Sequence, residues 1–316
     1  MRVNKVYTVF YLYIAIVALT SFVLPVIFDT LIPYVFDKYF FASFLFLQLL
    51  GFGVPLWFSL YKTSTLNEQT GIKQIGFESL RMDAQPIERK WLLLAPVMGI
   101  ATFYGFSFAK NGVETLLASS MADGQFSSQI QVVSIHTFLL FVLLFALLPS
   151  IFEEILYRGM FYDAFKHHSY VVLILPTIAF AVAHKGLVSF FGALILGLVT
   201  MFVMMKTGQL MYSMLIHFTY NVLFLVHSHL LKLPLSPEAE SVANASQPEL
   251  TSAALFQFAI SVVFFMLLLI LSKTKSNIPP AMVFSAAHQP NVHKKTVFIL
   301  FPIVIALVAV VLNVLL

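Results

Sequence analysis

The sequence has no cysteine and very little charge. Without cysteine the chain can form neither disulfides nor thiolate metal sites, and the redox state of its compartment cannot be inferred from the composition. Only 10% of the 316 residues are charged and 60% are hydrophobic, whereas about 25% of a soluble domain is charged. These proportions indicate an integral membrane protein. The net charge of +4 is spread among the loops without a basic block, so we expect no nucleic-acid partner.

Nine segments are apolar over a length that can cross a bilayer, which takes about 20 residues. They lie near residues 6–28, 39–61, 91–109, 134–152, 170–186, 188–205, 209–230, 254–272 and 297–316. A count of eight also fits, because the crowded region 134–230 can hold broken or partly submerged helices. We therefore predict an all-α fold, a polytopic transmembrane helical bundle of about 8–9 spans, with residues 1–316 forming a single integral-membrane domain.

Lysine and arginine are distributed unevenly among the loops. Arg2 and Lys5 precede the first span, and loops 62–90 and 273–296 hold most of the other loop cations. The alternate loops carry one lysine each: 29–38, 110–133 and 231–253. Because short cytoplasmic loops are enriched in cations, we predict a multi-pass protein of the cell (plasma) membrane with a cytoplasmic N-terminus. A short interfacial helix is predicted at 71–81 of the first cytoplasmic loop.

Three ionisable side chains, Glu153, Glu154 and Arg158, follow directly after the apolar run 138–148. Charge within a membrane is costly, so such groups normally face the bundle interior or a wet cavity and mark a functional site. On a helix Glu154 and Arg158 are i,i+4 and share a face, so they can pair. Glu153 is rotated by about 100° from Glu154 and lacks that partner. The pattern suggests one glutamate that is held in place and one that is free to do chemistry.

Two further apolar segments carry polar side chains. His184 ends an apolar run, with Phe180 one turn before it on the same face, and His217 and Asn221 are i,i+4. Small residues that permit close helix packing lie between these two segments: Gly192, Ala193 and Gly197.

Together these side chains suggest hydrolysis of a carbonyl substrate within the membrane. Two imidazoles and a carboxylate are a common ligand set for zinc, a carboxylate beside a water can act as general base, and an amide can stabilise an oxyanion. Taken singly, each element has an ordinary structural explanation: a solvated helix end, a histidine bonded to a carbonyl, and a packing pair. Their joint presence on three helices favours function. The sequence has no His-Glu-x-x-His, so it predicts no zincin-type site.

The three motifs occur in the order Glu153-Glu154-x-x-x-Arg158, Phe180-x-x-x-His184 and His217-x-x-x-Asn221. In this order they resemble the signature of the CPBP (CAAX protease and Abi) intramembrane proteases, a family that includes the type II CAAX prenyl endopeptidases. The motifs lie within residues 153–221. The resemblance implies a catalytic core at about 134–230.

The resemblance also implies a role for each residue. Glu153 activates the attacking water, and His184 shares that water or a metal with it. The pair that contacts the metal or stabilises the oxyanion is His217 and Asn221. Supporting roles fall on Glu154, Arg158 and Phe180. The implied ligands of zinc or another divalent metal are Glu153, His184 and His217, and a glutamate-activated water without metal is the other mechanism discussed for the family.

We therefore expect a bacterial-type membrane endopeptidase, a metalloprotease that hydrolyses membrane-associated or small peptide substrates, lipidated or not, in contact with the lipid bilayer. The alternatives are a non-catalytic membrane scaffold or sensor, such as a bacteriocin-immunity or regulatory partner, and a proton-coupled transporter. The transporter has less support because no internal repeat is visible.

One feature of the predicted spans disagrees with a shared site. Glu153 falls at the inner end of its predicted span, whereas His184 falls about 15 residues, or roughly 20 Å, into its own. Straight, upright helices would keep the two apart. Either Pro149 and Pro176 break or tilt these helices, or the predicted boundaries are wrong.

Overall fold

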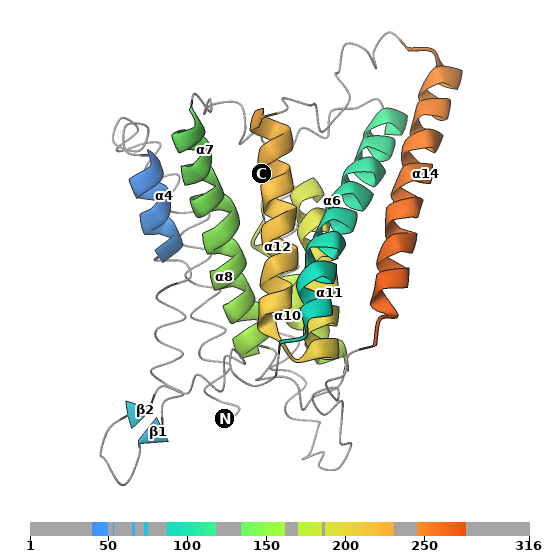
Figure 1. Ribbon diagram of the computed structural model, residues 1–316. Coiled ribbons are helices and arrows are strands. Elements are labelled where there is room, and N and C mark those ends of the chain that lie inside the picture. The colour runs from blue at the N-terminus through green and yellow to red at the C-terminus, as the bar shows by residue number, and fades with distance from the viewer. Residues whose placement is uncertain are drawn as a thin grey trace, which may run out of the picture.

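The computed structural model describes residues 40–49, 53, 65–66, 73–74, 87–117, 134–161, 170–184, 187–230 and 245–275. Nearly all of these residues are helical, which confirms the predicted helical fold (Figure 1). The exception is a short antiparallel pair of strands, β1 (Thr65–Leu66) and β2 (Lys73–Gln74). The interfacial helix predicted at 71–81 was therefore wrong at Lys73–Gln74, whose backbone bonds pair with β1.

The helices follow one another in chain order. They are α4 (Phe40–Gln48), α6 (Arg89–Leu117), α7 (Ile135–Phe141), α8 (Leu148–Glu154), α10 (Tyr170–Val182), α11 (Leu187–Thr207), α12 (Leu210–Leu225) and α14 (Gln247–Ser272). Three stretches have the wider π-helical turn: Val142–Leu147 between α7 and α8, Ile155–Phe161 after α8, and Val226–Leu230 after α12. The first two make the chain from Ile135 to Phe161 one continuous helix.

Five described segments are long and apolar enough to cross a membrane, and the chain is thus a multi-pass membrane protein. They are Arg89–Leu116, Ile135–Gly159, Val188–Thr207, Leu210–Ser228 and Pro248–Ser272. These confirm five of the nine predicted spans. The predicted spans near 6–28 and 297–316, and most of the one near 39–61, lie outside the described residues. Over the predicted span 170–186, α10 has only 13 residues, which is short for a complete crossing.

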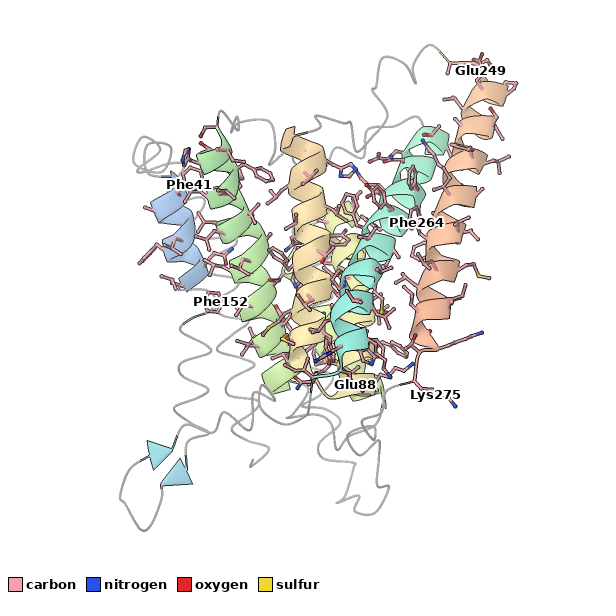
Figure 2. The ribbon with its side chains drawn as sticks, in the orientation of Figure 1. Phe41, Glu88, Phe152, Glu249, Phe264 and Lys275 are labelled. Atoms are coloured by element: carbon pink, nitrogen blue, oxygen red, sulfur yellow. The ribbon has the colours of Figure 1, made fainter. Side chains whose placement is uncertain are left out.

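Helix α12 lies at the centre of the described bundle. It contacts α6 on one side, α8 and the π-helical stretches around it on another, and α11 on a third, while α14 packs along α6 and α10 packs against α11 (Figure 1). The ends of the helices form two levels. Glu88 and Lys275 mark the lower level in Figure 2, and Glu249 marks the upper level.

Two glycines determine how α12 packs. Gly208 adopts a positive φ of 69°, and its N–H bonds the Met204 carbonyl at 2.8 Å, which ends α11 and turns the chain into α12. Gly99 of α6 faces α12, where a Cβ would lie 2.7 Å from the Ile216 carbonyl oxygen. A side chain at residue 99 would therefore force the two helices apart.

The helix that carries Glu153 is longer than predicted. The boundary predicted at residue 152 was wrong, because the helix continues to Phe161 and the apolar span to Gly159. Glu153 thus lies about 9 Å inside the end of its span, at 1.5 Å per residue. Neither Pro149 nor Pro176 breaks its helix. The corrected boundary removes about 9 Å of the predicted mismatch of depth, and His184 follows closely on the end of the short helix α10.

Candidate active site

Glu154 joins two of the three motifs. Its Oε1 atom accepts a hydrogen bond from Arg158 Nη1 at 3.0 Å and another from His217 Nδ1 at 2.9 Å. Glu154 and Arg158 are completely buried, and His217 is nearly so. The predicted i,i+4 pair is confirmed. The bond to His217 was not predicted, since the two residues are 63 positions apart on different helices.

The bond to Glu154 determines which nitrogen of His217 is free. A carboxylate only accepts hydrogen bonds, so Nδ1 carries a proton, and whenever the ring is neutral Nε2 keeps its lone pair. This Nε2 lies 3.8 Å from Glu153 Oε2, a buried atom without a hydrogen-bond partner among the described residues. This distance is too long for a direct hydrogen bond between the two atoms, but a water molecule can bridge them.

Phe180 brings the second histidine into the same group. His184 Nδ1 donates to the Phe180 carbonyl oxygen at 2.9 Å, which leaves its Nε2 as the acceptor. The fully buried Phe180 ring meets the His184 ring edge-on at 4.8 Å and the His217 ring at 5.6 Å between centroids. Both predicted histidines therefore pack against one aromatic ring.

Arg158 is held by aromatic rings as well as by Glu154. Its guanidinium carbon lies 4.5 Å from the Phe180 centroid and 5.7 Å from that of Tyr157, and these two rings pack edge-on at 5.2 Å. The attraction between a cation and ring faces helps to retain a charge in an apolar bundle. Tyr157 was missed by the sequence analysis. The only signal was an aromatic residue next to Arg158, which is weak.

Asn221 is placed on α12 one turn after His217 and is half-buried. Its side chain makes no hydrogen bond to another described residue. The structure thus brings Glu153, Glu154, Arg158, Phe180 and both histidines together, while Asn221 lies one turn away from His217 and its amide bonds none of the described residues.

The predicted metal ligands are only partly assembled. Glu153 and His217 face each other, yet the described residues contain no group of three His, Asp or Glu side chains that could hold a metal ion. A catalytic zinc site needs three protein ligands, so this arrangement does not fit a preformed zinc site. The ligand set Glu153, His184 and His217 stays a prediction.

Comparison with known proteins identifies the segment that carries the site. No curated protein and no solved structure matches the chain. Residues 135–223, which run from the start of α7 to α12, match the family described as type II CAAX prenyl endopeptidase Rce1-like. All seven predicted site residues fall within this match. It supports membership of this chain in the CAAX protease family.

Proposed function

We propose that the chain is an intramembrane endopeptidase that hydrolyses peptide bonds with a water activated by Glu153. One observation carries the proposal: the buried Oε2 atom of Glu153 has no hydrogen-bond partner among the described residues and faces Nε2 of His217, an imidazole whose other nitrogen is fixed by Glu154. A base needs an unsatisfied lone pair and a fixed direction. Membership in a protease family supports the same activity.

In the proposed reaction a water lies between Glu153 Oε2 and His217 Nε2. Glu153 takes one proton from this water while the water oxygen bonds to the carbonyl carbon of the peptide. The C–N bond then breaks, and the proton passes from Glu153 to the leaving amine. Asn221 stabilises the negative charge on the carbonyl oxygen of the tetrahedral intermediate by donating an amide N–H, and the acceptor Nε2 of His184 helps to position the attacking water.

No step of this reaction needs a metal, although zinc or another divalent ion stays a prediction. We expect proteolysis by purified enzyme to persist after treatment with EDTA and 1,10-phenanthroline. A loss of activity that added zinc restores would instead assign Glu153, His184 and His217 as metal ligands. Metal analysis of the purified protein gives the independent readout.

The proposed substrates are membrane-associated proteins or small peptides, with or without a lipid group, at the plasma membrane. Glu153 lies within its span, about 9 Å from the end of the span at Gly159. A substrate bond must therefore enter the membrane to reach it, which favours chains that are already anchored there.

The test compares peptide termini in cells that make the wild type, Glu153→Gln or Glu249→Gln at equal abundance. Glu249 caps α14 at the opposite end of the bundle and is exposed, so it serves as the matched control. Mass spectrometry of membrane and secreted peptides is expected to find termini that the wild type and Glu249→Gln share and Glu153→Gln lacks. Identical lists from all three strains would refute the proteolytic activity and favour the scaffold.

A further inference from the structure

Gly197 of α11 lies against the guanidinium group of Arg158. A Cβ at residue 197 would lie 2.9 Å from Arg158 Nη2, 2.9 Å from Thr177 Cγ2 and 3.2 Å from Phe180 Cδ1. Favourable contacts between heavy atoms lie at about 3.5–4.0 Å, so two of these three are severe overlaps. All three neighbours are completely buried, and none can swing into open space.

The overlap with Arg158 bears directly on the candidate site. Nη2 faces Gly197, and Nη1 of the same guanidinium donates to Glu154 Oε1. Because the guanidinium is a rigid plane, a push on Nη2 also moves Nη1. The same Glu154 oxygen holds His217 Nδ1. A methyl group at residue 197 is thus two contacts away from the imidazole that faces Glu153.

A glycine in the middle of a helix is less favourable than alanine by about 1 kcal/mol. The presence of glycine at residue 197 therefore calls for a structural explanation. We propose that Gly197 is a positioning residue of the active site, whose missing side chain keeps the Arg158 guanidinium on Glu154 and so keeps His217 directed at Glu153. This inference rests on the proposed function for its effect on activity, and its effect on His217 is independent of that function.

Gly192 provides a matched control on the same helix. A Cβ there would lie 2.9 Å from Phe106 Cε1 and 3.2 Å from Tyr220 Oη, so Gly192→Ala is also a tight substitution, with one contact below 3.0 Å where Gly197→Ala has two. Its neighbours belong to α6 and α12 and do not include the Glu154–Arg158 pair. Both variants perturb packing, and only Gly197→Ala is expected to disturb the site.

The first readout is the hydrogen bond from His217 to Glu154. It is monitored by NMR spectroscopy of the full-length protein, labelled with ¹⁵N-histidine, in detergent micelles. His217→Gln assigns the signal. In Gly197→Ala the Nδ1 proton is expected to move upfield as the bond to Glu154 weakens, whereas Gly192→Ala leaves it in place. An unchanged signal in Gly197→Ala, or the same change in both variants, would overturn the proposal. This holds even if the wild type shows no proteolysis, which would refute the proposed function alone.

The second readout is a double-mutant cycle with Arg158→Lys, which removes Nη2. We expect Gly197→Ala to lower product formation on the order of 10- to 100-fold in the wild type and by a smaller factor in the Arg158→Lys background, where only the overlaps with Thr177 and Phe180 remain. Additive losses would contradict the assigned contact. If Gly197→Ala alone does not fold, folding of the double variant to the level of Arg158→Lys supports the contact. Failure of the double variant to fold would show that Gly197 serves helix packing and refute its positioning role.

Discussion

The two adjacent glutamates are expected to respond oppositely to one substitution, glutamine for glutamate. In Glu154→Gln the charge that balances Arg158 is lost while the guanidinium stays completely buried. At the observed 3.0 Å, and with an effective dielectric constant of about 20, the lost attraction is about 5.5 kcal/mol. Measured losses for one partner of a buried pair are about 3–5 kcal/mol, and we expect Glu154→Gln to fall in that range.

Glu153→Gln is expected to cost little stability or none. The Oε2 atom of Glu153 is buried without a hydrogen-bond partner among the described residues, so an amide removes the cost of burying a charge and loses no bond. The same change removes the proposed base. Activity is therefore expected to disappear in a protein that folds at least as well as the wild type.

The assay is thermal unfolding in detergent. After heating, the fraction of protein that still elutes as a monodisperse peak in size-exclusion chromatography is measured against temperature. At roughly 2–4 °C per kcal/mol, Glu154→Gln is expected to lower the midpoint by about 6–20 °C, and Glu153→Gln by less than about 2 °C. Equal destabilisation by the two substitutions would refute the assignment of one glutamate to support and the other to chemistry. Activity that survives Glu153→Gln would refute the proposed base.

Three further predictions test other parts of the structure. Phe180→Leu removes the ring that meets both histidines and is expected to lower product formation about tenfold in folded protein; unchanged cleavage would contradict that role. Gly208→Ala places a side chain at positive φ and is expected to cost about 1–2 kcal/mol of stability with cleavage per folded molecule unchanged, and an unaltered unfolding midpoint would argue against the turn. Because the chain has no cysteine, Ala245→Cys and Lys275→Cys each give a single label site outside the span Pro248–Ser272. An impermeant maleimide is expected to reach the first from outside intact cells and the second only after lysis, and the reverse pattern would invert the predicted orientation.

Much of the fold followed from composition and from the length of the apolar runs. Five predicted spans correspond to membrane-compatible helices, because in a bilayer each backbone polar group must be satisfied within its own segment. The errors lay at helix ends. Hydropathy falls at the first charged residue, so the predicted span ends at residue 152, just before Glu153. The helix itself continues to Phe161, because the charged side chains that follow are buried in the bundle and Arg158 is paired with Glu154.

Contacts within one helix turn were also predictable. The Glu154–Arg158 pair follows from the i,i+4 geometry of any helix and is confirmed at 3.0 Å. The bond between Glu154 and His217 depends on the packing of α12 against α8, which is a tertiary contact between segments far apart in the sequence. No pattern in the sequence relates these two residues, and only the family resemblance placed them in one site.

The shared oxygen of Glu154 explains why the two glutamates cannot exchange roles. Oε1 of Glu154 accepts hydrogen bonds from both Arg158 and His217, so the lone pairs of this oxygen are already in use. Glu153 Oε2 accepts none from the described residues and keeps its lone pairs for a proton. Arg158 therefore fixes Glu154, which in turn fixes the orientation of His217, and among the described residues Glu153 is left as the carboxylate that faces the free Nε2. Moving Arg158 by one residue along the helix would pair it with the other glutamate or with neither, so the spacing of the motif is itself a requirement of the proposed chemistry.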